Sequence, residues 1–394
     1  MSQLDARLRD ELATIAAADR YRRRRVVEVI DIAAPTRVRV DGHACVNFCS
    51  NDYLGLATHT EVWRAMSVAA ERYGVGSAAA HLVTGHSPEH QALEAELAEF
   101  VGHERALLFS TGYMANLGIA SALLKRGDAV FADRLNHASL LDAGLSSGAR
   151  FLRYRHNDTA DLQKKLHLLS SAQRKLVMSD GIFSMDGDTA PLHDLAAICA
   201  QQQAILMVDD AHGFGVLGDR GQGSVVAAGL SATQVPIYMA TLGKAAGVAG
   251  AFIAGSDELI EILIQKARTY IYTTAMPPAF AAATRTALRL LQHESWRREQ
   301  LQLLITRFRL GAQQLGLQLM NSATAIQPVL LGSEAAALSA SSALLKAGFL
   351  VGAIRPPTVP VGTSRLRITL SAAHSETDVD NLLLALSVLP RVAA

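Results

Sequence analysis

The sequence predicts an α/β protein in which a mostly parallel sheet forms a large domain, with a small α+β domain at the C-terminal end. Two observations lead to this prediction. Short apolar runs alternate with amphipathic stretches through the middle of the chain, and 50% of all residues are hydrophobic. Strands separated by helical segments are typical of βαβ units, whose parallel sheet is buried on both faces and needs a large core.

The composition excludes several classes of protein. The chain of 394 residues is long enough for two to three domains. Its 37 Lys+Arg residues balance 36 Asp+Glu residues, so it lacks the basic excess of a nucleic-acid binder. Its apolar stretches are shorter than the about 18 residues of a transmembrane helix, and its charged N-terminus predicts no secretory signal. We therefore expect no nucleic-acid or membrane partner.

The three cysteines, Cys45, Cys49 and Cys199, form no CxxC pair. We therefore expect neither a disulfide framework nor a zinc site, and a reducing cytoplasm as the location. His86 and His90 are spaced as in a zinc helix, but no Glu follows the first His, and Pro88 suits the start of a helix. We expect no metal at these histidines.

The first 25 residues are predicted to form a helix, because Leu4, Leu8, Leu12 and Ile15 recur at helical spacing. Arg20 and 22–25 end this predicted helix. These five arginines form either a solvated helix end, where cations favour the helix dipole, or a platform for an anionic substrate.

The remaining elements follow in order along the chain. Short strands are expected from about Val38, and helices at about 60–73 and from His90 to Val101. Six apolar runs predict the strands of the main sheet: 106–109, 129–131, 176–179, 205–208, 237–240 and 251–254. A long helical region from Ala279 to about Leu315 then leads to a last strand at 365–370. We expect an N-terminal arm at 1–50, a large domain at 51–285 and a small domain at 286–394.

Two carboxylates and a lysine follow two of the predicted strands. Asp209 and Asp210 come directly after the apolar run 205–208, and Lys244 follows the run 237–240. Ligands of open α/β sheets bind at the carboxyl ends of the strands. An acid and a lysine placed there suit pyridoxal phosphate, because the lysine amine condenses with the aldehyde and the carboxylate keeps the ring nitrogen protonated. A helix cap and a solvated lysine would explain each feature singly, but not both together.

Other polar residues follow the neighbouring strands. The segment 110–113 (STGY) joins a strand to a helix, where backbone N–H groups and hydroxyls can hold a phosphate. His137 could stack on a planar cofactor, and either Asp180 or Ser184 could reach the same edge of the sheet. Thr241 could add a hydroxyl to the phosphate.

Motifs along nearly the whole chain, from about Arg22 to His374, resemble those of the α-oxoamine synthase family. They are NDYLGL (51–56), STGYMAN (110–116), DRLNHASLLDA (133–143), GIFSMDGDTAPL (181–192), VDDAHGFGVLG (208–218), TLGKA (241–245), TTAMPP (273–278) and RPPTVPVGTSRLRITLSAAH (355–374). This family consists of fold-type I pyridoxal-phosphate enzymes that join an amino acid to an acyl thioester with loss of CO2. The resemblance implies an aspartate aminotransferase-like fold with a seven-stranded sheet in the large domain.

Within the family, the sequence is most similar to members that condense L-alanine with a pimeloyl thioester, carried by CoA or by an acyl carrier protein. Glycine C-acetyltransferase, 5-aminolevulinate synthase and serine palmitoyltransferase are the alternatives, because they share the reacting lysine and aspartate. A non-catalytic scaffold subunit is an alternative of another class, but such a protein is expected to lack the lysine.

The resemblance also implies roles for individual residues. Lys244 would form the Schiff base, Asp209 would pair with the pyridine nitrogen, His212 would bond the ring hydroxyl and His137 would stack on the ring. Gly112, Tyr113 and Thr241 would hold the cofactor phosphate, and Ser184 would lie beside the ring. Arg22, Thr358 and Asn51 would contact substrate, and Arg367 would bind the amino-acid carboxylate. The family implies a homodimer with a shared site, in which Thr273 or, as we expect, Thr274 reaches the partner's phosphate.

The sequence departs from the family pattern at two places. Ala245 and Ala246 follow the lysine, where an aromatic residue or a leucine is common, and alanines stand at 78–80, where glycines are common. Neither change removes a reacting group, so we expect an altered pocket shape and unaltered chemistry.

Overall fold

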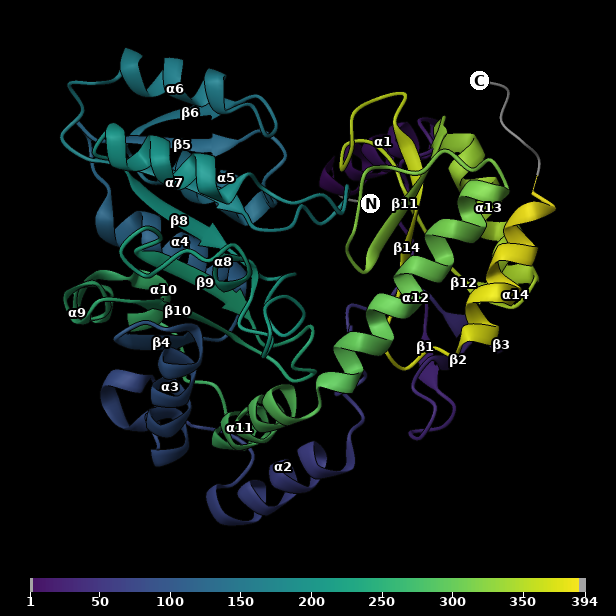
Figure 1. Cartoon of the computed structure of the whole chain (residues 1–394), viewed down its shortest axis with the longest axis horizontal. Coiled ribbons are helices and arrows are strands. Elements are labelled where there is room, and N and C mark those ends of the chain that lie inside the picture. The colour runs from purple at the N-terminus through teal and green to yellow at the C-terminus, as the bar shows by residue number, and fades with distance from the viewer. Residues whose placement is uncertain (1–2, 390–394) are drawn as a thin grey trace. The chain divides into compact units, whose positions relative to one another are not determined.

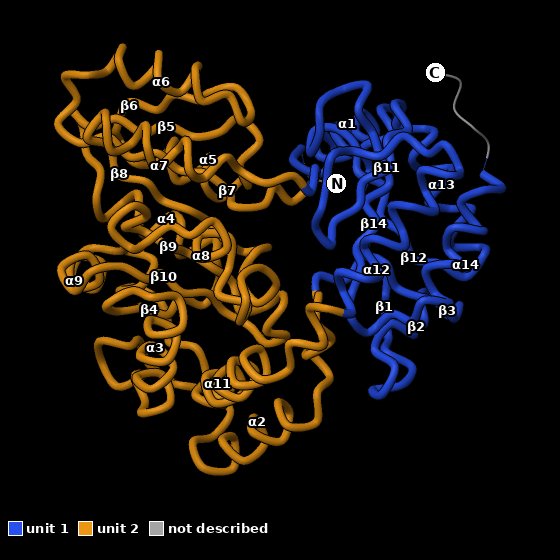
Figure 2. Tube along the Cα trace, viewed as in Figure 1, with its two compact units in different colours: residues 1–51, 185–187, 300–394 blue, residues 52–184, 188–299 orange. Residues whose placement is uncertain are grey.

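The computed structural model describes residues 3–389, which form two compact units (Figure 2). Unit 1 comprises residues 1–51, 185–187 and 300–394, and unit 2 comprises residues 52–184 and 188–299. The N-terminal arm thus belongs to the same unit as the C-terminal segment. The units divide inside a helix at 299/300, whereas we expected a domain boundary at 285/286. Of the helices in residues 3–389, none combines the length and apolar character that a membrane span requires.

Unit 2 is built on a seven-stranded sheet (Figure 1). Its strands, in spatial order, are β4 (Arg105–Phe109), β10 (Ala251–Gly255), β9 (Ile237–Thr241), β8 (Ile205–Asp209), β7 (Lys175–Asp180), β5 (Ala129–Asp133) and β6 (Arg150–Tyr154). Only β10 runs antiparallel to its neighbours. The predicted fold class, an α/β protein with a mostly parallel sheet, is therefore confirmed.

The helices of unit 2 pack either directly on this sheet or on one another. They are α2 (Thr60–Tyr73), the π-helical turn η1 (His81–Gly85), α3 (Pro88–Val101), α4 (Gly112–Leu123), α5 (Ala138–Ser146), α6 (Thr159–Leu168), α7 (Leu192–Gln201), α8 (Ser224–Ala227), α9 (Asp257–Lys266), α10 (Arg268–Ile271) and α11 (Pro278–His293). One face of the sheet packs on α4, α5 and α9 through side chains such as Val130, Met178 and Met239. The alternate residues, such as Val177 and Phe252, are buried as well. Apolar side chains on both faces explain the near-continuous apolar runs in the sequence.

All six predicted strands are present, but the seventh, β6, escaped prediction. Its sequence, Arg-Phe-Leu-Arg-Tyr, includes two arginines, and only Tyr154 is fully buried. β6 lies at the edge of the sheet and pairs with β5 alone. An edge strand is partly solvated, so it lacks the apolar run that marks the central strands.

Unit 1 contains two smaller sheets. The first consists of β1 (Val27–Val29), β2 (Arg37–Val40), β3 (His43–Asn47) and β12 (Phe349–Leu350), and the second of β11 (Ile326–Gly332), β14 (Ser364–Thr369) and β13 (Gly352–Ile354). The helices are α1 (Gln3–Ala17), α13 (Glu334–Lys346), α14 (Glu376–Ser387) and the part of α12 (Ser295–Gln314) from residue 300 onward. Strand β14 is buried along its whole length and carries Arg367.

Two predicted helices were wrong in extent. The N-terminal helix α1 ends at Ala17, and residues 20–26 are not helical, so the arginines do not form a helix end. The apolar stripe of α1 was read correctly as helical, but all of its residues are exposed. The long region from Ala279 consists of two helices, α11 and α12, because Glu294 interrupts it.

Candidate active site

The buried carboxylate of Asp209 lies at the carboxyl end of β8 and has two fixed partners. Its Oδ1 accepts a hydrogen bond from the Ala211 backbone N–H at 3.1 Å, and its Oδ2 accepts one from Asn116 Nδ2 at 2.8 Å. Asn116 is fully buried on α4. A carboxylate that is held by two donors keeps one orientation, as expected of a group that must meet a ligand atom at a defined position.

Lys244, His212 and Tyr53 form a chain of polar contacts. Lys244 Nζ lies 2.9 Å from His212 Nε2, and His212 Nδ1 lies 2.6 Å from the Tyr53 hydroxyl. His212 and Tyr53 are buried, whereas Lys244 is half-buried. Lys244 follows β9 and His212 follows β8, so neighbouring strands bring the lysine to the end of the sheet where Asp209 lies.

His137 begins α5, and a polar relay links it to Asp209. Asn116 Nδ2 also donates to Ser139 Oγ at 2.8 Å, and the Ser139 hydroxyl lies 2.7 Å from His137 Nδ1. Because Ser139 Oγ accepts from Asn116, its own proton points to His137 Nδ1. In the neutral ring the proton of His137 is therefore on Nε2. The exposed ring of His137 is fixed by this contact.

A second carboxylate, Asp180, lies beside Asp209. The two residues are paired in register at the ends of β7 and β8, and Asp180 is buried. Its Oδ2 accepts a hydrogen bond from the His137 backbone N–H at 2.7 Å. Burial raises the pKa of Asp180 well above its ordinary value, and the nearby charge of Asp209 adds to this effect. Of the pair, Asp180 is therefore the acid whose surroundings disfavour the charged form.

The N-terminus of α4 and the end of β9 form a small cradle. Thr111 caps the helix by accepting a hydrogen bond from Met114 N, and Gly112 follows it. A Cβ on Gly112 would lie 2.7 Å from Thr241 Cγ2, so only glycine allows this close approach. Within the described residues, the buried Thr241 hydroxyl has no hydrogen-bond partner. Tyr113 turns its hydroxyl to Asp142 instead and is exposed.

The remaining predicted cofactor residues of unit 2 are Ser184 and Thr274. Ser184 is half-buried and lies four residues beyond the end of β7. Thr274 is exposed in the loop between α10 and α11, and Thr273 is half-buried.

The predicted substrate residues of unit 1 form two separate contacts. Arg367 is buried on β14, and its guanidinium donates to Thr369 Oγ1 at 2.9 Å and to Asn51 Oδ1 at 3.3 Å. Arg22 Nη2 donates to Thr358 Oγ1 at 3.4 Å. Each contact thus joins two residues that were predicted separately to bind substrate and that lie more than 300 positions apart in the sequence.

Sequence reasoning missed several residues of the site. Asn116, Ser139 and Tyr53 hold the predicted residues in place, yet only their motifs, and no role for them, were noted. Asn116 and Ser139 lie 93 and 70 positions from Asp209, and Tyr53 lies 159 positions from its partner His212. The signal that could have found Asn116 is its position on α4, one turn beyond the predicted phosphate loop.

The structure shows the local conformation at both departures from the family pattern. Ala245 and Ala246 are buried, and a Cβ on Gly215 would lie 2.7 Å from Ala245 Cβ. The turn after Lys244 is therefore tightly packed, and it has no room for a larger side chain at position 245. Ala78 has a φ of 57°, the left-handed region that glycine adopts most easily.

Three histidines, His81, His86 and His90, gather near η1 with ligating atoms within 4.8 Å of one another. Both nitrogens of His90 are used within the fold: Nδ1 accepts from Ser87 N at 3.0 Å, and Nε2 lies 2.6 Å from Met276 O. The Nδ1 atoms of His81 and His86 lie 3.0 Å apart. These contacts cap α3 and fasten the loop to residue 276, which gives the cluster a structural role.

The family model of aminotransferase class I and II matches residues 43–386. The chain belongs to the aminotransferase class I and II family. An 8-amino-7-oxononanoate synthase from Cellvibrio japonicus is 60% identical, over 97% of this chain and 95% of the relative.

Solved structures of this aminotransferase-type fold are similar along the chain. A serine palmitoyltransferase from S. paucimobilis with a bound PLP–myriocin aldimine matches with a TM-score of 0.91 at 30% identity, over 99% of this chain and 98% of that one. An 8-amino-7-oxononanoate synthase from Francisella tularensis matches with a TM-score of 0.77 at 32% identity, over 87% of this chain and 97% of that one.

Proposed function

We propose that this protein is a PLP-dependent acyltransferase that condenses L-alanine with a pimeloyl thioester. The products are 8-amino-7-oxononanoate, CO2 and the free thiol carrier, and the reaction belongs to biotin biosynthesis. The observation that carries this proposal is the 60% identity, over nearly the full length, to an 8-amino-7-oxononanoate synthase. The grouping of Lys244, His212 and Asp209 at adjoining strand ends supports it.

The residues present fit pyridoxal phosphate. Thr241 offers a buried hydroxyl without a hydrogen-bond partner in the described chain, and the N-terminus of α4 beside it offers backbone N–H groups. A helix N-terminus favours a phosphate. Gly112 and Tyr113 would therefore hold the phosphate through backbone N–H groups and Thr241 through its hydroxyl. Ser184 and His137 would flank the ring, and His212 would bond its hydroxyl. When bound, the cofactor supplies an aldehyde that condenses with amines and a ring that accepts electrons from the α-carbon of the amino acid.

Asp209 and Lys244 are the groups that move or hold protons. Asp209, fixed by Asn116 and Ala211, holds a proton at the ring nitrogen, and its negative charge keeps that nitrogen cationic. Lys244 Nζ removes the α-proton of alanine as a general base. His212 contacts Lys244 Nζ and orients the amine.

The substrates meet cationic groups of unit 1. Arg367 would bind the alanine carboxylate, because its planar guanidinium is buried and held by Thr369 and Asn51. Arg22 and Thr358 would bind the acyl donor. In the overall reaction, a bond forms between the alanine α-carbon and the thioester carbonyl carbon, the C–S bond breaks, and the carboxylate leaves as CO2.

The active form is proposed to be a homodimer with a shared site. The exposed position of Thr274, in a loop without regular structure, leaves its hydroxyl accessible to a second subunit. In that arrangement Thr274 would bond the phosphate in the partner's site.

A substrate panel tests this function. The purified holoenzyme is given L-alanine, glycine or L-serine with pimeloyl, acetyl, succinyl or palmitoyl thioesters, and release of the free thiol and CO2 is measured. We expect turnover with alanine and the pimeloyl thioester. Turnover with glycine or serine only would replace this function by that of another α-oxoamine synthase, and no turnover with any pair would support a scaffold role. The Lys244→Ala variant is the matched control without the reacting amine.

A further inference from the structure

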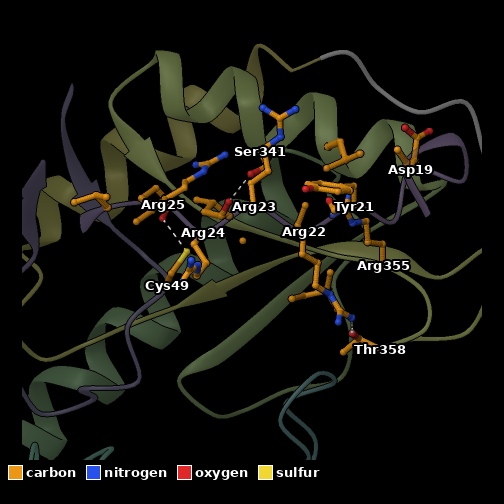
Figure 3. Close-up of a pocket in the computed structure, with 18 residues that line it drawn as sticks. Asp19, Tyr21, Arg22, Arg23, Arg24, Arg25, Cys49, Ser341, Arg355 and Thr358 are labelled. Atoms are coloured by element: carbon orange, nitrogen blue, oxygen red, sulfur yellow. Dashed lines mark hydrogen bonds between the residues drawn. The ribbon is translucent and has the colours of Figure 1, made fainter. Parts of the chain in front are cut away.

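A large open cavity lies wholly within unit 1, and the segment that joins α1 to β1 forms part of its lining (Figure 3). Its volume is about 1580 Å³. The lining includes five arginines, 22–25 and Arg355, together with an apolar floor that contains Leu338, Leu350 and Val351. A cavity of this size exceeds the usual range for a small ligand, which is about 300–1,000 Å³.

The charges of these arginines are not balanced by carboxylates. Within residues 3–389, none of the five has a carboxylate oxygen within 4.0 Å, whereas eight other arginines do. Asp19 is the single acidic residue among those that line the cavity. Like charges brought together raise the free energy of the protein unless an anion binds among them. The cavity therefore favours a ligand with several negative charges.

Hydrogen bonds hold the arginine segment in place. Arg22 reaches Thr358 Oγ1, as Figure 3 shows, and Arg355 Nη2 donates to Tyr21 O at 3.0 Å. The segment then enters β1, which pairs with β2. The arginine segment is thus anchored at both ends, so less side-chain and backbone entropy is lost when a ligand binds.

The cavity adjoins the proposed site for the alanine carboxylate. Cys49 lines the cavity, and burial raises the pKa of its thiol to about 11. Gly352 also lines the cavity, and it is paired in register with Arg367 on the neighbouring strand β14. A ligand in the cavity is therefore close to the amino-acid carboxylate site of the same unit.

We propose that this arginine cavity binds the phosphate groups of the acyl donor's carrier, through Arg23, Arg24, Arg25 and Arg355. The inference rests on the proposed function, because it takes the carrier of the thioester as the ligand. Phosphate suits the cavity because guanidinium groups bind it with paired, charge-assisted hydrogen bonds. The apolar floor suits the neutral pantetheine chain. The phosphates belong either to the nucleotide of CoA or to the phosphopantetheine arm of a carrier protein.

The test measures binding of four probes to the holoenzyme by titration calorimetry. The probes are CoA, dephospho-CoA, 4′-phosphopantetheine and pantetheine. In a triple variant with Arg23→Gln, Arg24→Gln and Arg25→Gln, we expect the Kd for CoA to rise about tenfold or more, since three charge-assisted contacts are lost. The Kd for pantetheine should stay within about twofold. CoA binding to the wild type should weaken with salt, because the charges are partly solvated.

Arg20→Gln is the matched control, because Arg20 belongs to the same segment but does not line the cavity. It should bind CoA as the wild type does. Equal CoA affinity of the triple variant and the wild type would overturn the proposal, and so would equal losses for CoA and pantetheine. If the triple variant loses affinity for CoA but not for dephospho-CoA, which lacks the 3′-phosphate, the site is assigned to CoA itself. If the triple variant also loses affinity for 4′-phosphopantetheine, the site is assigned to the phosphopantetheine arm that CoA shares with a carrier protein.

A thioester without phosphate separates this inference from the proposed function. Turnover of pimeloyl-N-acetylcysteamine with alanine tests the function without the cavity. If this thioester is converted but the arginines do not affect CoA binding, the cavity inference alone fails. If no pimeloyl thioester is converted but the triple variant loses CoA binding, the proposed function alone fails.

Discussion

The amine of Lys244 and the ring of His212 lie 2.9 Å apart, and the other ring nitrogen of His212 lies 2.6 Å from the hydroxyl of Tyr53. A charged lysine can only donate, so it makes Nε2 the acceptor, and Nδ1 then carries the proton toward Tyr53. A neutral lysine permits the opposite tautomer. The three groups can therefore rearrange their protons without any movement of heavy atoms, which suits a lysine that must alternate between holding and accepting a proton.

Replacement of Lys244 by alanine should abolish catalysis. The variant loses both the amine that binds the cofactor covalently and the proposed general base, so we expect turnover to fall by at least about 100-fold. Protein mixed with pyridoxal phosphate and then desalted should lack the visible absorption of a Schiff base. A variant that keeps this absorption would show that another amine binds the cofactor.

The adjoining acids Asp209 and Asp180 should respond differently to the same substitution. Asp209→Asn removes the charge that keeps the ring nitrogen protonated, so we expect turnover to fall by about 100-fold or more. Asp180→Asn is the matched control. Burial raises the pKa of Asp180, so its surroundings favour the uncharged acid, and an amide oxygen can still accept from His137 N. Its turnover should stay within about threefold of the wild type.

Steady-state kinetics with alanine and a pimeloyl thioester, together with urea unfolding, check this pair of variants. Near-normal turnover in Asp209→Asn would contradict the role of Asp209. A large loss of turnover in Asp180→Asn, with an unchanged free energy of unfolding, would show that the two acids share one negative charge.

The central strands of unit 2 and the candidate site at their ends were predictable for the same physical reason. A strand buried on both faces must be continuously apolar, so the run before Asp209 marks both the strand and its end. The edge strand β6 is not subject to this constraint and was missed. Asn116 and Ser139 were not assigned roles because a hydrogen-bond partner on another element leaves no trace in local spacing.

The N-terminal segment shows a different limit of sequence reasoning. The spacing of its leucines predicts a helix correctly, but periodicity continues to favour helix only while apolar residues recur. No apolar position follows Ile15 before Tyr21 except alanines, and the helix ends at Ala17. In the segment beyond it, Arg22 bonds Thr358, and the carbonyl of Tyr21 accepts a hydrogen bond from Arg355; both partners lie in the C-terminal part of the chain.

His156 should make the stability of the protein depend on pH in the alkaline range. It lies between two carboxylates, with Nδ1 at 3.1 Å from Asp133 and Nε2 at 2.7 Å from Asp188. Burial lowers the pKa of His156, but the two hydrogen bonds and charges outweigh burial and raise it to about 10. Because the folded pKa exceeds the unfolded value of about 6.5, the stabilisation is complete below pH 6.5 and is lost as the pH rises through 10.

The variant His156→Gln should therefore be less stable than the wild type by about 3 kcal/mol near pH 6, since it leaves buried carboxylates without a cation. The difference should shrink as the pH approaches 10. Urea unfolding of both proteins between pH 6 and 10 measures it. A difference that stays constant over this range would mean that His156 is neutral in the folded protein.

Ala78 should be replaceable by glycine with a gain in stability. Its φ of 57° costs an L-residue about 1 kcal/mol, and the loop cannot relax because Ala79 O accepts from Ala275 N at 2.9 Å and Ser77 Oγ donates to Met276 O at 2.7 Å. Glycine adopts this conformation without strain, so Ala78→Gly should raise the free energy of unfolding by about 0.5–1 kcal/mol. Ala80 is the matched control: its φ is −68°, which alanine adopts readily, so Ala80→Gly should lower stability by about 0.5–1 kcal/mol. The midpoints of urea unfolding compare the two variants with the wild type, and a loss of stability in both would show that the backbone at Ala78 is not strained.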